Sequence, residues 1–274
     1  MNLFKKTNSL VEKESEEIAD NIVNSAQKQD KLKKKFKLGG DTYAMAFSAL
    51  HWDSSRQMNL SQNEVYNAYH SSCIVSFIQL LMLTVVAFVI FGDGPLVISM
   101  PSSVTILALR FVCTMLMHLQ VESDVRQGLR MMKYLVNHTE DFSAPFNAFA
   151  IGFMQVFTGL ATELACICFL ATVGSEIDVI IKYMALSSIA KVDDIYANAL
   201  PADNRIKNDY EQLEVKNHRR DLNNRIEKEG LGIAFRIGRF VYKVIRMFYS
   251  SYVFYFFPYT TLIVPYIAEF LKRE

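Results

Sequence analysis

Hydrophobic residues in this chain come in long blocks that alternate with densely charged ones. Charged residues crowd into three regions, 1–40, 121–141 and 191–246. By contrast, residues 73–91 and 146–173 contain one charged group between them, Glu163. A soluble fold spreads charge along the solvent face of every amphipathic helix, so this segregation favours a bilayer. The pattern predicts an all-α, polytopic helical membrane protein with four to five hydrophobic segments plus interfacial and cytoplasmic helices.

A transmembrane bundle is predicted within residues 61–200. Its spans are expected near 73–91, 104–120, 146–173 and 177–190. The first follows a capping box, in which the Ser61 hydroxyl and the Glu64 carboxylate each bind the other residue's amide, so a helix should begin near residue 62. The fourth is short and carries Asp178 and Lys182. The preceding residues, 41–60, are predicted to form an interfacial helix and loop, because their apolar face is weak and ends near the single tryptophan, Trp52.

Residues 231–274 are predicted to form a basic amphipathic helix and a C-terminal hydrophobic segment. Arg236, Arg239, Lys243 and Arg246 share an arc of about 80 degrees at 100 degrees per residue. An interfacial helix with its basic side chains among lipid headgroups explains this arc better than a voltage-sensing helix does, because the spacing of three breaks after Arg239. Residues 247–270 contain two prolines, which fits a kinked fifth span or a re-entrant hairpin; the kinked span is favoured.

The two remaining polar regions are predicted to lie outside the bilayer. Residues 1–40 form a disordered basic tail, which is either simply solvated or bound to anionic lipid. Its candidate lipid-surface residues are Lys31, Lys33, Lys34, Lys35 and Lys37. Residues 201–230 are predicted to form a charged cytoplasmic helix that docks on its own protein or on a partner, since their apolar positions are too sparse for a coiled coil.

Positive charge predicts the topology. The loop at residues 92–103 lacks Lys and Arg, whereas residues 120–145 and 191–246 are rich in them. Because short cytoplasmic loops carry the excess of Lys and Arg, the amino terminus is expected on the cytoplasmic or matrix side of an integral membrane protein.

The third span carries a stripe of small and polar residues at helical spacing. Its members are Ala148, Gly152, Gln155, Gly159, Thr162 and Cys166. In lipid, helices associate by close backbone approach over small residues and by polar contacts, so this stripe is a predicted helix-packing face.

Glu163 lies at the edge of this stripe and needs a partner within the membrane. Arg110 on the second span is expected at similar depth, which predicts an intramembrane ion pair between Arg110 and Glu163. Two interpretations stay open: the pair fixes helix register, or it belongs to a proton or cation pathway with His118, Asp178 and Lys182 as further polar positions.

Catalytic signatures are missing from the sequence. It has no nucleophile elbow, phosphate-binding loop, dinucleotide fingerprint or zinc spacing, and its four cysteines all lie in apolar segments. We therefore expect no enzyme activity, cofactor, metal or nucleic-acid partner. The expected partners are a bilayer with anionic lipid and other membrane subunits or copies of the chain. The leading hypothesis is a non-catalytic structural or accessory subunit of a larger membrane complex; the alternative is a small oligomeric ion channel or transporter.

Overall fold

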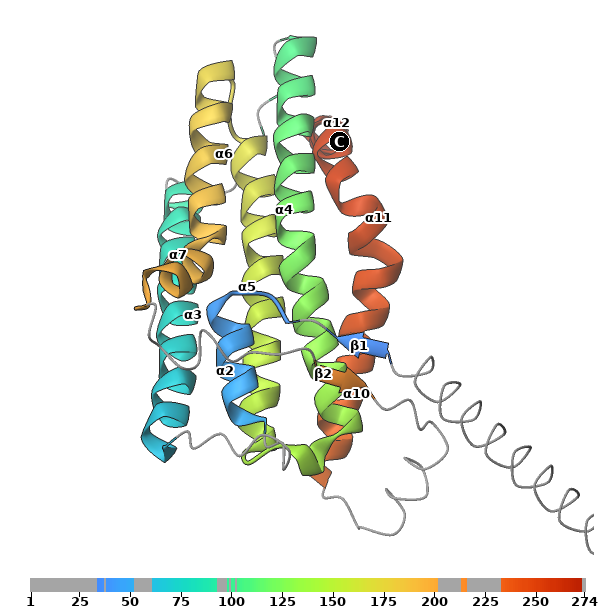
Figure 1. Ribbon diagram of the computed structural model, residues 1–274. Helices are drawn as coiled ribbons and strands as arrows, with labels where there is room; N and C mark the ends of the chain where they lie inside the picture. The colour runs from blue at the N-terminus through green and yellow to red at the C-terminus, as the bar shows by residue number, and fades with distance from the viewer. Residues whose placement is uncertain are drawn as a thin grey trace, which may run out of the picture. The chain divides into compact units, whose positions relative to one another are not determined.

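A computed structural model describes residues 34–36, 38–51, 61–92, 98, 100, 101, 103–201, 213–215 and 233–272 (Figure 1). The chain divides into two compact units. One consists of Met1–Lys37 with Gln212–Gly230, and the other of Leu38–Glu211 with Leu231–Glu274. In the first unit, β1 (Lys34–Phe36) pairs antiparallel with β2 (Leu213–Val215).

The strand pair contradicts two sequence predictions, in each case within the few residues that the structure describes. Residues 201–230 were predicted as a charged helix, but their described part beyond residue 201, Leu213–Val215, is a strand. The predicted tail at residues 1–40 contains the other strand, which holds Lys34 and Lys35. Lys31, Lys33 and Lys37, together with the rest of both predictions apart from residues 38–40, lie outside the described residues.

The second unit is built from helices. Their bounds are α2 (Thr42–Leu50), α3 (Gln62–Phe91), α4 (Val104–Asn137), α5 (Pro145–Ala171), α6 (Glu176–Ala190), α7 (Val192–Ala199), α10 (Ile233–Phe248), α11 (Phe254–Phe256) and α12 (Thr260–Lys272). A 3-10 turn, Thr139–Asp141, follows α4. A π-helical turn, Tyr249–Val253, precedes α11, and a 3-10 turn, Phe257–Tyr259, follows it.

Four helical segments of the described chain are long and apolar enough to cross a membrane: Gln62–Phe91, Val104–Asn137, Pro145–Ala171 and Arg236–Phe270. This confirms the prediction of an all-α, polytopic helical membrane protein. The predicted capping box is also present, because the Ser61 amide donates to the Glu64 carboxylate at 2.7 Å and the Glu64 amide donates to the Ser61 hydroxyl at 3.3 Å.

The outer faces of these helices suit hydrocarbon better than water. On α3, Ser72 and Gln79 are buried, whereas Phe77, Phe88 and Val89 are 65%, 71% and 63% exposed. A helix of a water-soluble protein has the opposite arrangement, with its apolar stripe inside. This reversed polarity, together with the length of the helices, identifies a membrane-embedded protein.

The predicted fourth span does not reach the length of a crossing. Helix α6 has 15 residues, or about 22 Å at 1.5 Å per residue, against about 30 Å of hydrocarbon. It packs along α4, where the Gln120 side-chain amide donates to the Ser187 carbonyl at 3.1 Å and accepts from the Ser187 hydroxyl at 2.8 Å.

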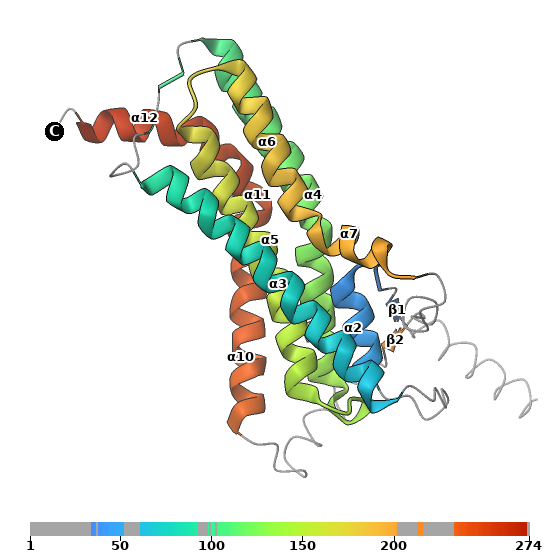
Figure 2. The ribbon, with the colours of Figure 1, turned by 90° about the vertical axis from the view of Figure 1, so that its left-hand side faces the viewer.

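The C-terminal segment is continuous helix, where a separate interfacial helix and hydrophobic segment had been expected. Helices α10 and α11 run beside α4 (Figure 1). The chain bends at Phe257–Tyr259, after which α12 turns away from α10 and α11 (Figure 2). Pro258 accounts for the bend, because proline lacks an amide hydrogen and its ring clashes with the preceding helical turn.

Helix α2 is an internal helix, which differs from the predicted interfacial location. Tyr43 and Phe47 are only 1% and 0% exposed, and eight of its nine residues are buried. It packs against α3, α5 and α7. The weak apolar face in its sequence has a simple reason: a helix surrounded by protein does not need a polar side.

Candidate functional site: a buried polar seam

The small and polar stripe of α5 lies inside the bundle. Ala148, Gln155, Thr162 and Cys166 are at most 2% exposed, Gly152 is also buried, and Gly159 is half-buried. A methyl group on Gly152 would lie 2.9 Å from Cγ of Met132 and 3.2 Å from the carbonyl oxygen of Gly128. At Gly152 the stripe therefore faces α4 at a distance that leaves no room for a larger side chain.

Gly128 completes this contact from the side of α4, and the sequence reading did not single it out. A methyl group there would lie 2.8 Å from the Gly152 carbonyl oxygen, which belongs to the backbone. Further along, a methyl group on Gly159 would lie 2.8 Å from Val125. These contacts set the antiparallel alignment of α4 and α5. An isolated glycine within a strongly helical segment was the available signal.

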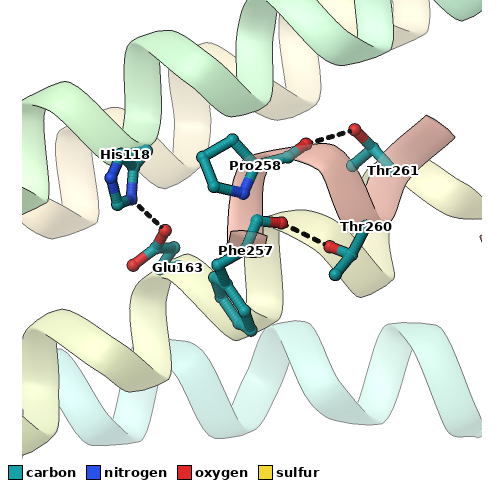
Figure 3. Close-up of polar contacts among 6 residues, drawn as sticks. All are labelled: His118, Glu163, Phe257, Pro258, Thr260 and Thr261. Carbon is teal, nitrogen blue, oxygen red and sulfur yellow. Dashed lines mark hydrogen bonds and ion pairs between the residues drawn. The ribbon is translucent and has the colours of Figure 1, made fainter. Parts of the chain in front are cut away.

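This alignment places His118, and not Arg110, beside Glu163. Nδ1 of His118 lies 2.5 Å from Oε1 of Glu163, so the two side chains are joined by a short hydrogen bond (Figure 3). The two residues are only 4% and 1% exposed. The imidazole of His118, on the facing helix α4, is therefore the partner that Glu163 needs within the membrane.

Arg110 binds elsewhere, which corrects the predicted ion pair. Its guanidinium donates to the backbone carbonyl of Val173, just beyond the C-terminal end of α5, and the side chain is 1% exposed. Continuing the alignment from Gly128 and Gly152 brings Arg110 level with Leu170 near this end, about seven residues or 10 Å beyond Glu163. The positive charge also complements the negative end of the α5 dipole.

The bend near the C-terminus adjoins the His118–Glu163 pair. The ring centroid of Phe254 lies 6.1 Å from that of His118. At the bend, the Thr260 and Thr261 hydroxyls donate to the carbonyls of Phe257 and Pro258 at 2.5 and 2.9 Å (Figure 3). Each hydroxyl thus bonds to a backbone carbonyl three residues earlier, so it needs no water molecule at membrane depth.

The polar residues buried between α4 and α5 are called the seam. The hydroxyl groups in the seam bond within their own helices. The Thr114 hydroxyl donates to the Arg110 carbonyl at 2.9 Å, and the Thr162 hydroxyl donates to the Thr158 carbonyl at 2.8 Å. Such bonds satisfy a polar group at membrane depth without a water molecule. These threonines therefore place hydroxyl groups between the helices whose hydrogen bonds are made within their own helix.

One end of the seam is anchored by Asp41, the N-cap of α2. Its carboxylate accepts hydrogen bonds from the side-chain amides of Gln127 and Gln155, at 2.6 and 3.1 Å, and from the backbone amide of Ala44 at 2.6 Å. Burial raises the pKa of this carboxyl above its ordinary value. Gln155, which was predicted from the stripe, thus joins α5 to α2.

A second set of polar contacts joins α2, α3 and α7. The Tyr43 hydroxyl donates to Oε1 of Gln79 at 2.7 Å, and Nε2 of Gln79 donates to the Asp193 carboxylate at 3.3 Å. The Thr42 hydroxyl donates to the Asp193 backbone carbonyl at 2.7 Å. Burial, followed by the charge of Asp41, raises the pKa of Asp193 to about 8.

The second set was not predicted from the sequence. Gln79 lies within the apolar residues 73–91, so it had the same signal as Gln155, a polar side chain inside a predicted span. Tyr43 and Asp193 had no comparable signal, because tyrosine and aspartate are common in polar segments. Only the fold brings α2 and α7 to the side of α3.

The basic residues predicted to meet lipid lie on α10. Arg236, Lys243 and Arg246 are exposed, and Arg239 is half-buried. Arg246 also donates to the Tyr242 hydroxyl at 3.3 Å. A basic row on the outside of a bundle is available to anionic headgroups.

No protein-family model, curated protein or solved structure matches this chain. Within the described ranges, no three or more His, Cys, Asp and Glu side chains are placed to hold a metal ion. Any functional conclusion therefore has to come from the geometry of the seam and of the helix surfaces.

Proposed function

We propose that this protein is a non-catalytic structural or accessory subunit of a larger membrane complex. The observation that supports this proposal best is the bonding within the seam. Most of its polar side chains bond to one another or to helix backbones, as the pair of His118 with Glu163 and the contact of Arg110 with Val173 illustrate. Polar contacts of this kind fix helix register, and the exposed apolar faces of the helices are then free to meet lipid or neighbouring subunits.

A double-mutant cycle on the pair tests the structural role. Replacing Glu163 or His118 alone by leucine leaves a buried polar partner behind, which we expect to cost about 3–5 kcal/mol of unfolding free energy. The double variant His118→Leu/Glu163→Leu is expected to be more stable than either single variant. Unfolding in detergent micelles measures all four proteins. Additive losses in the double variant would contradict a register-fixing pair.

A second candidate is a small oligomeric ion channel or transporter, favoured by the burial of an ionisable pair at membrane depth. It predicts proton or cation flux through liposomes that contain the purified protein. Glu163→Gln would abolish this flux without unfolding the protein, whereas Glu176→Gln, at an exposed position, would not. Wild-type liposomes with background flux support the subunit proposal, and flux that depends on Glu163 refutes it.

We also propose that the amino terminus lies on the cytoplasmic or matrix side. The exposed basic residues at the carboxyl-terminal half of α4, Arg126, Arg130 and Lys133, support this orientation. A cysteine at exposed Ser123 should react with a membrane-impermeant maleimide only after permeabilisation. A cysteine at exposed Gly174, near the other end of the bundle, should react in intact cells or mitoplasts. The reverse labelling would overturn the orientation.

A further inference from the structure

A cavity of about 360 Å³ lies where α10 crosses the end of α4 and the start of α5. Its volume is at the lower end of the roughly 300–1,000 Å³ typical of ligand sites. The walls are almost entirely apolar and include Leu135, Val136, Phe146, Phe149, Ile237 and Val241. A cavity with such walls suits a hydrocarbon chain and offers little to a polar metabolite.

The cavity reaches the outer apolar surface of the protein. Two of its lining residues, Phe146 and Ile237, are themselves 78% and 57% exposed. An occupant can therefore enter from the side of the bundle.

A single formal charge belongs to the described residues that line the cavity, the guanidinium of Arg239. Exposed Arg236 and Lys243 lie on the same helix and add positive charge nearby. A guanidinium presents two parallel N–H donors that match the oxygens of a phosphate group. The charge and the apolar walls together match a molecule with an anionic head and a hydrocarbon tail.

We propose that this cavity binds an acyl chain of an anionic phospholipid, with the lipid phosphate held by Arg239. The proposal goes beyond the function proposed above, because it names a discrete lipid site that both a subunit and a transporter could contain. It also differs from general adhesion to a charged surface, since the cavity selects one lipid and one basic residue.

Gly238 provides a way to close the cavity without removing any contact. A methyl group there would meet the ring of Phe149 at 3.7 Å or more, which is ordinary van der Waals contact. Gly238→Leu would extend into the cavity, and replacing a helical glycine also favours the helix. Gly238→Ala is the matched control, because it changes helix propensity in the same direction but fills little space.

The charge is tested by a second matched pair. Arg239→Gln removes the guanidinium that lines the cavity, while Arg236→Gln removes an exposed one from the same helix. Both variants lower the net charge by the same amount. If lipid is held by surface charge alone, the two variants should therefore lose retained lipid equally. If Arg239 holds the lipid in the cavity, Arg239→Gln should lose more than Arg236→Gln.

The experiment uses the purified full chain in detergent, incubated with phosphatidylglycerol or phosphatidylcholine of equal chain length, and counts retained lipids by native mass spectrometry. We expect the wild type, Gly238→Ala and Arg236→Gln to retain one phosphatidylglycerol in preference to phosphatidylcholine by about tenfold. Arg239→Gln should lose the preference, and Gly238→Leu should lose both lipids.

Three results would overturn the proposal. Equal effects of Arg239→Gln and Arg236→Gln would mean that lipid is held by surface charge alone. Unchanged retention in Gly238→Leu would place the lipid elsewhere, as would equal losses in Gly238→Leu and Gly238→Ala. If Gly238→Leu does not fold, Val241→Phe fills the same cavity from a half-buried position of α10 and is read in the same way.

Discussion

The contact between Gly128 and Gly152 gives the sharpest prediction about stability. Adding a methyl group at Gly128 places Cβ 2.8 Å from the Gly152 carbonyl oxygen and 3.2 Å from the Val156 amide nitrogen. Both atoms belong to the α5 backbone and cannot rotate away. An ordinary contact begins near 3.4 Å, so α4 and α5 must separate locally by about 0.6 Å.

The size of the effect follows from two opposing contributions. Overpacking in a well-packed interior costs about 1–3 kcal/mol. Replacing glycine by alanine within a helix returns up to about 1 kcal/mol of helix propensity. Gly128→Ala should therefore be destabilised by about 1–2 kcal/mol. Gly238→Ala, whose new methyl group makes only ordinary contacts, should be neutral or stabilised by up to about 1 kcal/mol.

Equilibrium unfolding in mixed micelles, followed by circular dichroism, measures both variants against the wild type. The comparison is internal, because the same atoms are added at two helical glycines and only their surroundings differ. The reasoning is refuted if Gly128→Ala is as stable as Gly238→Ala, since α4 and α5 would then not be in close backbone contact.

Three further predictions concern single side chains. The folded pKa of Asp193, about 8, lies above its unfolded value of about 3.9, so its contribution to stability is complete below pH 4 and is lost as pH rises toward 8. Wild type should therefore lose stability over this range relative to Asp193→Asn, by at most about 6 kcal/mol, and the same dependence of unfolding free energy on pH in both proteins would contradict this. Tyr43→Phe should cost about 1–2 kcal/mol in thermal unfolding, because Oε1 of Gln79 loses its donor; an unchanged midpoint would argue against the bond. Phe77→Ala, at a 65% exposed position, should stay within about 0.5 kcal/mol of wild type in detergent, whereas Val75→Ala, at a 1% exposed position, should cost about 1–3 kcal/mol; the reverse order would mean that α3 is turned the other way.

Features that depend on neighbouring residues in the chain could be predicted well. The capping box at Ser61 and Glu64 places the start of α3, because both hydrogen bonds lie within one helical turn. The spacing of Gly152 and Gln155 identifies the packing face of α5, because residues three and four apart share one side of a helix. The separation of apolar from charged blocks predicts a membrane protein for a similar reason, since it is set by the chain alone.

Predictions about partners failed where they required a position along another helix. Arg110 and His118 lie on the same helix, two turns apart, and either is a plausible partner for Glu163 by its chemistry. The choice depends on how far α4 is shifted along α5. That shift follows from the contact of Gly128 with Gly152, which involves backbone atoms that are distant in sequence.

The sequence by itself thus determined that the long apolar segments become helices, that these helices suit a bilayer, and which face of α5 is small enough to pack closely. Only the tertiary structure decided that α2 is buried, that α6 packs along α4, and that Glu163 meets His118. The physical reason is that helix formation and lipid preference are summed over neighbouring residues, whereas an ion pair depends on the offset between two helices, and a shift of two turns changes the partner entirely.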